Sequence, residues 1–217
     1  MAIKKVGVIG AGQMGSGIAH VVALAGYDVL LTDLTKEAVD KAIETIGRNM
    51  DRQIARGIIT VADKQAALQR ISYAPDYDAF ADCDLVIEAA TEDESVKRKI
   101  FTELSPKVKP DAIVASNTSS ISITRLASIT KRPERFIGMH FMNPVPVMQL
   151  VELIRGIATE DDTFATAREF VESLGKTIAV AEDFPAFIVN RILLPMINEA
   201  VYTLYEGVGT VEAIDKA

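Results

Sequence analysis

Two side chains that can move protons stand on neighbouring apolar runs of this chain. His140, one of two histidines, ends the run RFIGMH, and Glu152 lies inside MQLVELI. A histidine titrates close to neutral pH and suits general-base chemistry, and a carboxylate bonded to its other ring nitrogen fixes its tautomer. The turn NPVPV lets the chain reverse between the runs. Each residue alone is as readily a strand-end or edge-strand residue, but a pairing of the two would explain both locations.

A glycine-rich loop follows the first apolar run. Three glycines in VIGAGQMG form the pattern G-x-G-x-x-G between an expected strand and an expected helix. Such glycines allow a tight turn, a close approach to a pyrophosphate and packing of the helix on the strand, while the helix N-terminus faces the phosphates. The alternative is a turn that only packs the helix on the sheet. The loop residues expected to contact a cofactor are Gly10, Gly12, Gln13, Met14 and Gly15.

An acidic residue, Asp33, closes the run DVLLTD 18 positions after Gly15. This is near the spacing expected for a carboxylate that binds the adenosine ribose of a dinucleotide. Its charge would repel a 2′-phosphate, and the next residues, Leu34 and Thr35, offer no arginine to hold one. Lys36 argues weakly in the other direction. The sequence therefore predicts a site for NAD rather than NADP.

These residues need a scaffold that brings strand ends to one edge. Short β-branched runs alternate with longer amphipathic stretches over residues 5–180, which is typical of a doubly wound, mostly parallel α/β sheet of the Rossmann type. Ligands bind such sheets beyond the carboxyl ends of the strands. Ser119 follows the run AIVAS and His140 ends its own run, so both are expected there. Hydride transfer at this edge would need a base for the hydroxyl proton, a task that suits His140.

The alternation stops at AEDFPAF, because Pro185 cannot continue a central strand. We expect a sheet domain over 1–182 and an all-helical second domain over 183–217, which looks incomplete because TVEAIDKA is too short to be stable alone. Pro195 predicts a kink or a restart in the apolar helix expected at 187–206. The breadth of that apolar surface predicts a homo-oligomer, most simply a homodimer.

The 217 residues carry a formal net charge of −7 and include one cysteine. The acidic balance argues against nucleic acid or an anionic membrane surface as a partner, because both need clustered positive charge. No apolar run reaches the ~20 residues of a membrane span, and the first residues lack a signal-peptide pattern, so we expect a cytoplasmic protein. Cys83 is expected to be a small buried hydrophobe and His20 a packing histidine; no metal site is predicted.

Several stretches together resemble one family, the 3-hydroxyacyl-CoA dehydrogenases. The motifs similar to that family are VIGAGQMGSGIA, DLVIEAATE, ASNTSSISIT, RFIGMHFMNPVPVMQLVELI and FIVNRILLPMINEA. The resemblance implies NAD-dependent interconversion of an (S)-3-hydroxyacyl-CoA, most closely 3-hydroxybutyryl-CoA, and the 3-oxoacyl-CoA. It implies His140 as the base with Glu152 as its partner, and Ser119 and Asn190 as hydrogen-bonding residues near the reacting oxygen. The residues implied around NAD are Asp33, Glu92, Lys97, Asn117, Ser119 and Asn143.

Coenzyme A needs cations for its phosphates. Arg48, Arg52 and Arg56 recur every four residues on one face of the helix expected at 35–56. A solvated helix face explains this stripe equally well, although the resemblance favours Arg52 and Arg56 as coenzyme A contacts. Without the resemblance, Asn190 is as readily an interdomain structural residue as a substrate ligand.

Two departures from the family pattern stand out. Met142 replaces the usual phenylalanine and bears on acyl-chain preference, and Ala186 replaces the usual glycine and bears on the interdomain hinge. Two other functions are compatible with a sequence of this kind. One is a β-hydroxyacid dehydrogenase of the phosphogluconate or hydroxyisobutyrate type, a class associated with a lysine-based mechanism. The other is a non-catalytic NAD-binding protein derived from the family. The intact pair of His140 and Glu152 argues against the second.

Overall fold

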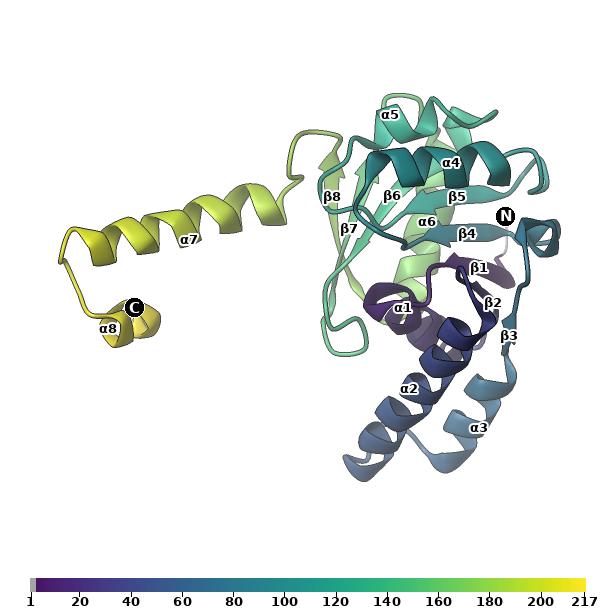
Figure 1. Cartoon of the computed structure of the whole chain (residues 1–217), viewed down its shortest axis with the longest axis horizontal. Helices are drawn as coiled ribbons and strands as arrows, with labels where there is room; N and C mark the ends of the chain where they lie inside the picture. Colours follow the sequence, from purple (N-terminus) through teal and green to yellow (C-terminus); the bar gives the residue numbers. More distant parts are fainter. Residues whose placement is uncertain (1–2) are drawn as a thin grey trace.

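The computed structural model describes residues 3–217, and an eight-stranded sheet dominates it (Figure 1). The strands are β1 (Lys5–Ile9), β2 (Asp28–Thr32), β3 (Ile71–Tyr73), β4 (Leu85–Glu88), β5 (Ile113–Ser116), β6 (Phe136–Phe141), β7 (Leu150–Arg155) and β8 (Thr177–Glu182). Their order is β3-β2-β1-β4-β5-β6-β7-β8, and all pairs are parallel except β6 with β7. The mostly parallel doubly wound sheet expected from the sequence is therefore confirmed.

Helices cover both faces of this sheet (Figure 1). The α-helices of the sheet domain are α1 (Gln13–Leu24), α2 (Lys36–Ala55), α3 (Val61–Gln69), α4 (Glu94–Leu104), α5 (Ile123–Ala127) and α6 (Asp161–Ser173), and the 3₁₀ helices are η1 (Tyr77–Phe80) and η2 (Pro133–Arg135). Successive strand residues point to opposite faces, and the buried residues accordingly form two cores. Val8 and Leu85 belong to the core under α1, α2 and α6, whereas Val86 and Val114 belong to the core under α4 and α5.

Strand order reverses between β2-β1 and β4, so the carboxyl ends of β1 and β4 open into a crevice. The loops that follow β1, β2, β4 and β5 all leave the sheet at this edge. At the other side of the sheet, β6 and β7 form the antiparallel hairpin, because the short connection at 142–149 leaves no room for a crossover helix. The C-terminal end of β6 and the N-terminal end of β7 therefore lie at the same edge of the sheet as the crevice.

Helix α3 and strand β3, which lie between α2 and β4, are not predicted by the sequence pattern. Helix α3 buries only one residue, Ala67, and is thus barely amphipathic. Strand β3 has three residues and sits at the sheet edge, paired only with β2. Both therefore lack the periodicity from which a helix or a strand can be predicted.

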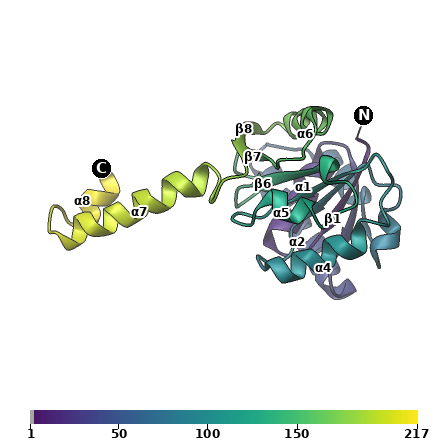
Figure 2. The same cartoon turned by 90° about the horizontal axis from the view of Figure 1, so that it is seen from above.

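Helix α7 (Val189–Tyr205) and the short helix α8 (Val211–Lys216) project from the sheet domain (Figure 2). Helix α7 runs without interruption through Pro195, so the alternative of a helix restart at this residue is wrong. Before α7 the chain turns through Ala186 and Phe187, which both have positive φ angles, of 68° and 50°. None of the 17 residues of α7 is buried. Among residues 3–217, no helix combines the length and the apolar character that a bilayer span needs.

Candidate active site

The glycine loop between β1 and α1 has the geometry of a phosphate-binding turn. Gly10 has a φ of 102°, and a Cβ on Gly15 would lie 1.7 Å from the carbonyl oxygen of Gly10. Gly12 differs, because a Cβ there would meet nothing within 4 Å. Gly12 is the N-cap of α1 and provides no side-chain cap, so the first N–H groups of the helix have no side-chain partner. The loop can therefore accept the pyrophosphate of a dinucleotide.

Asp33 is held against this loop. Its Oδ2 accepts a hydrogen bond from the Ala11 N–H at 2.5 Å, and its Oδ1 accepts one from the Leu34 N–H at 2.7 Å. The carboxylate thus stands at the carboxyl end of β2 beside the crevice, where the ribose of a dinucleotide is expected. Lys36 does not offset its charge, because both carboxylate oxygens of Asp40 hold the Lys36 ammonium, at 2.7 and 2.6 Å.

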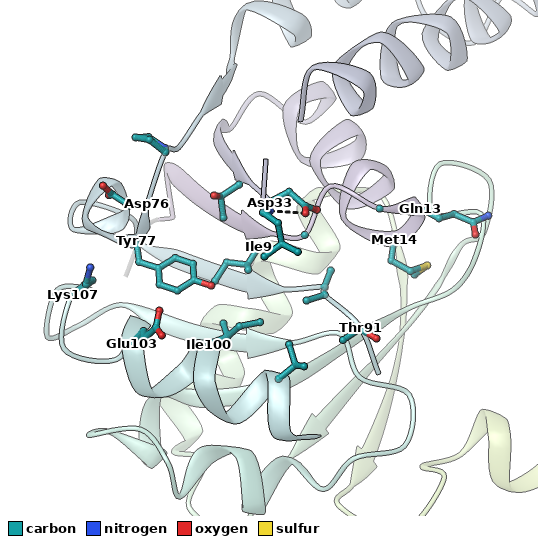
Figure 3. Close-up of a pocket in the computed structure, with 18 residues that line it drawn as sticks. Ile9, Gln13, Met14, Asp33, Asp76, Tyr77, Thr91, Ile100, Glu103 and Lys107 are labelled. Carbon is teal, nitrogen blue, oxygen red and sulfur yellow. Dashed lines mark hydrogen bonds between the residues drawn. The ribbon is translucent and has the colours of Figure 1, made fainter. Parts of the chain in front are cut away.

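A cavity of about 680 Å³ extends from the glycine loop across the carboxyl ends of β1, β2 and β4 (Figure 3). Gly10, Gly12 and Asp33 line one end, and Tyr77 and Ile100 line the other. A second cavity of about 520 Å³ lies on the opposite side of the loop, between α2 and the turn that follows β6. The cofactor loop thus separates two hollows, one of which reaches toward α4 and the other toward α2.

His140 and Glu152 are directly opposite each other in the hairpin of β6 and β7. The His140 ring nitrogen Nδ1 lies 2.7 Å from Oε2 of Glu152. Glu152 is completely buried and His140 is 7% exposed. The pairing expected from the sequence is present, and it explains how a carboxylate is accommodated inside an apolar strand.

The second carboxylate oxygen of Glu152 faces a different element. Oε1 accepts hydrogen bonds from the N–H groups of Ile188 and Val189, both at 2.9 Å. These groups stand at the start of α7, where N–H groups lack partners within the helix. The Phe187 ring also lies beside the His140 ring, with 6.0 Å between centroids. Glu152 therefore joins the histidine to the first turn of the second domain, a role that no sequence pattern indicated.

Asn190 also reaches the sheet domain. Its Nδ2 donates a hydrogen bond of 3.2 Å to the carbonyl oxygen of Ser119, which lies in the loop after β5. The four residues assigned to catalysis from the sequence thus form two contacting pairs, His140 with Glu152 and Asn190 with Ser119. Each pair lies at the carboxyl-terminal edge of the sheet or at the helix that abuts it.

Glu92 organises the loop that carries Ser119. Its Oε1 accepts hydrogen bonds from the hydroxyls of Thr118, at 2.6 Å, and Ser120, at 2.9 Å, and from the Ser119 N–H, at 2.9 Å. Burial would raise the pKa of Glu92, but these hydrogen bonds and the positive charge of Lys97 outweigh it and lower the pKa. Glu92 is therefore ionised near neutral pH and holds the serine loop in place.

Lys97 is buried and is bound mainly by a residue that the sequence did not indicate. Its Nζ lies 2.7 and 2.9 Å from the two carboxylate oxygens of Glu88 and 3.7 Å from Glu92. The Ser116 hydroxyl donates a further hydrogen bond of 2.6 Å to Glu88. The only sequence signal for Glu88 was its charge at the end of the apolar run DLVIE. The three side chains form a closed polar cluster beneath the crevice.

The remaining predicted residues have diverse surroundings. Asn117 Oδ1 accepts a hydrogen bond of 2.9 Å from the Phe141 N–H and so links β5 to the end of β6. Asn143 precedes a cis peptide bond to Pro144 and lines the second cavity together with Gln13. Met14 lines the first cavity.

The arginine stripe of α2 contributes to neither of these two cavities. Arg52 and Arg56 are exposed, and the Arg52 guanidinium donates only a long 3.4 Å hydrogen bond to Asn49. Lys41 and Asn49 of the same helix do line the second cavity. Both residues were missed, since their spacing matches no charge pattern.

Two other expectations are confirmed. His20 is buried in α1, where its Nε2 lies 2.9 Å from Oε1 of Gln53. Cys83 is a buried free thiol whose pKa is raised to about 11 by burial. Such a thiol is protonated at neutral pH and unsuited to nucleophilic chemistry.

Together, the doubly wound sheet, the open glycine loop and the ribose-side carboxylate define an NAD-dependent oxidoreductase. Residues 5–184 match the model of the 3-hydroxyacyl-CoA dehydrogenase NAD-binding domain, and residues 187–217 match that of the 3-hydroxyacyl-CoA dehydrogenase C-terminal domain. The chain belongs to the 3-hydroxyacyl-CoA dehydrogenase family and is an NAD-dependent 3-hydroxyacyl-CoA dehydrogenase. This membership excludes the β-hydroxyacid dehydrogenases with a lysine-based mechanism.

Named relatives agree with this assignment. The chain is 67% identical to a 3-hydroxybutyryl-CoA dehydrogenase of Bradyrhizobium diazoefficiens, in an alignment that covers 99% of the chain and 73% of the relative. It is 51% identical to a probable 3-hydroxybutyryl-CoA dehydrogenase of Deinococcus radiodurans, over 97% of the chain and 76% of the relative. The crystal structure of (S)-3-hydroxybutyryl-CoA dehydrogenase from Ralstonia eutropha superposes with a TM-score of 0.95 at 48% identity, covering 98% of the chain and 75% of that structure.

Proposed function

We propose that His140 is the general base of the reaction and that Glu152 orients it. The observation that carries this proposal is the 2.7 Å contact between His140 Nδ1 and the buried Glu152 carboxylate. A proton on Nδ1, shared with Glu152, leaves Nε2 free to take the substrate hydroxyl proton. In the reducing direction, the same nitrogen returns that proton to the oxygen.

Bound NAD supplies the hydride acceptor, or as NADH the hydride donor. Side chains of the protein transfer the hydroxyl proton and form hydrogen bonds to the substrate oxygen from which it departs. A buried carboxylate stabilises the imidazolium that forms when His140 takes up the proton. Ser119 and Asn190 are assigned as uncharged hydrogen-bonding residues for the reacting oxygen. Their mutual contact supports this assignment, because it places both at the junction of the sheet and α7.

The cofactor set is proposed to span the crevice. Gly12 and the N-terminus of α1 are proposed for the pyrophosphate and Asp33 for the ribose. Lys97 is nearly fully buried against Glu88, so we assign it an electrostatic role beneath the cofactor rather than a hydrogen bond to it. The other proposed cofactor residues are Gly10, Gln13, Met14, Gly15, Glu92, Asn117, Ser119 and Asn143.

We propose 3-hydroxybutyryl-CoA, in its (S) form, and acetoacetyl-CoA as the substrate pair. The printed names of the relatives support this choice. For the coenzyme A phosphates we propose Arg52 and Arg56 as the contacts. Both are exposed and unpaired by any carboxylate within residues 3–217, and they lie beyond the second cavity, in the last turn of α2 and at its C-cap. The proposed domains are residues 1–182 for the cofactor and 183–217 for part of the substrate and dimer region.

We also propose a homodimer in the cytoplasm. On α7, Ile192, Met196 and Val201 are each more than half exposed, and a second copy of the chain would remove this apolar surface from water. The single cysteine is a free thiol, which is usual in reducing compartments. Sedimentation of a monomer at micromolar concentration would contradict the dimer.

The substrate proposal is tested by NADH oxidation with acetoacetyl-CoA and with free acetoacetate at matched concentrations. We expect rapid turnover of the thioester and, because coenzyme A contributes binding energy, far slower turnover of the free acid. Equal rates with both compounds would contradict the proposed role of coenzyme A. Arg52→Ala should raise KM for acetoacetyl-CoA, whereas Arg168→Ala, on the distant helix α6, should leave it unchanged.

A further inference from the structure

The end of the first cavity farthest from the glycine loop has features that the catalytic proposal does not use. The cavity continues past Asp33 to η1 and to the C-terminal half of α4. Figure 3 shows the Tyr77 side chain reaching from η1 into this end, between Ile9 on one side and Ile100 on the other. A dinucleotide with its pyrophosphate at Gly12 and its ribose at Asp33 would place its base here.

The walls of this end suit a flat aromatic ligand. Ile9, Val96 and Ile100 supply aliphatic surface, and the Tyr77 ring adds an aromatic one. Leu34, next to Asp33, also lines the cavity and is 99% exposed. A leucine so fully exposed gains nothing from the fold itself, but it would lose contact with water if a base lay against it. This end of the cavity is therefore an apolar slot that is open to solvent beside Leu34.

Two polar groups face this slot. Within residues 3–217, neither the half-buried Tyr77 hydroxyl nor the solvent-exposed Glu103 carboxylate has a hydrogen-bond or ion-pair partner. In Figure 3 the Glu103 carboxylate points toward Tyr77. Burial raises the pKa of Tyr77, and the negative charge of Glu103 raises it further, so the hydroxyl keeps its proton. The slot thus presents one donor and one charged acceptor.

The nearby cation is already engaged. Lys107 lines the same end of the cavity, but its Nζ lies 2.9 Å from Oδ1 of Asp78. Lys107 therefore does not neutralise Glu103 by direct contact. An amino group with N–H donors fits such an acceptor, whereas a carbonyl oxygen in the same place would face the carboxylate charge.

We propose that Tyr77 and Glu103 recognise the adenine of NAD. The aliphatic walls pack against the faces of the base, the Tyr77 hydroxyl approaches its edge and donates a hydrogen bond to a ring nitrogen, and the Glu103 carboxylate accepts one from the exocyclic amino group. The inference rests on the proposed position of the cofactor. It makes both residues determinants of base specificity, separate from the ribose contact at Asp33.

The test compares dissociation constants for NADH and for reduced nicotinamide hypoxanthine dinucleotide, in which a carbonyl oxygen replaces the amino group. Fluorescence titration gives both values for the wild type and for Glu103→Gln and Tyr77→Phe. The matched controls are Glu169→Gln on α6 and Tyr27→Phe, whose hydroxyl lies 2.6 Å from Ser173 Oγ outside the cavity.

We expect the wild type to prefer NADH by about fivefold or more, since a site built to bond a donor rejects an analogue without it. Glu103→Gln should bring this preference close to one, because an amide can also donate to the carbonyl. Tyr77→Phe should weaken NADH binding by roughly threefold to tenfold through the lost hydrogen bond. Both control variants should behave as the wild type.

Three results would overturn the proposal. They are equal affinity of the wild type for the two dinucleotides, survival of the preference in Glu103→Gln, and unchanged NADH affinity in Tyr77→Phe. Each of these leaves the dehydrogenase assignment intact, because NADH still binds. A wild-type protein that failed to bind NADH at all would instead overturn the proposed cofactor site together with this inference.

Discussion

Replacing Glu152 with glutamine tests the coupling between the catalytic pair and α7. The carboxylate accepts hydrogen bonds from Ile188 and Val189 at Oε1 and lies 2.7 Å from His140 Nδ1 at Oε2. In Glu152→Gln, the amide oxygen must face the two backbone N–H groups, because an NH₂ group there would set donors against donors. The amide nitrogen is then forced to face the imidazole.

This orientation selects the wrong tautomer of His140. Facing an N–H donor, Nδ1 must act as an acceptor, which moves the single proton of the neutral ring to Nε2, the nitrogen proposed to act as the base. We expect kcat to fall by about 10²–10⁴-fold, the range for loss of general-base catalysis and of a tautomer-fixing carboxylate. Stability should change by only about 1–2 kcal/mol, since both backbone hydrogen bonds persist.

The assay is NADH oxidation by acetoacetyl-CoA under saturating conditions, with urea denaturation of the same preparation. Glu182→Gln, at the exposed end of β8, is the matched control and should keep full activity. The coupling to α7 is read from a second variant, Glu152→Ala, which should lose more stability than Glu152→Gln because it also frees the helix N–H groups. A Glu152→Gln enzyme with kcat within about tenfold of wild type would refute the proposed tautomer control.

Three further predictions concern stability and are read from urea denaturation. Ala186→Gly should stabilise the chain by roughly 0.5–1 kcal/mol, because Ala186 has a φ of 68°, a conformation that glycine adopts without strain; an unchanged or lower midpoint would contradict this. Glu88→Gln should cost about 3 kcal/mol because it removes the close partner of the buried Lys97 charge and leaves only Glu92, at 3.7 Å, while Glu172→Gln, in an exposed pair, should cost under about 0.5 kcal/mol. Burial lowers the pKa of His20 from 6.5, so unfolded chains bind protons more readily and stability should fall as the pH drops below about 6.5; the same slope in His20→Gln would show that His20 is not the cause.

The pairing of His140 with Glu152 could be predicted because it depends on local sequence. Two apolar runs joined by a proline-rich turn must form a hairpin, and the hairpin register then sets opposite residues together. The glycine loop and Asp33 were predictable for a similar reason, since their spacing reflects one β-α-β unit. Such features need no knowledge of how distant elements pack.

Two contacts that the sequence did not predict depend on tertiary packing. Glu88 and Lys97 are nine residues apart, and nothing in their spacing shows that both are buried against each other. The N–H groups of Ile188 and Val189 became ligands of Glu152 only because α7 begins beside β7. Backbone donors leave no trace in residue types, so such a contact cannot be predicted from sequence.

The most direct test of the proposed mechanism is the turnover of acetoacetyl-CoA and NADH by His140→Gln, measured beside NADH affinity in the same preparation. The proposed role of His140 predicts a fall in kcat of about 10²-fold or more with NADH affinity close to wild type. A variant that binds NADH and retains kcat within about tenfold of wild type would contradict His140 as the base and would place the proton transfer on another group.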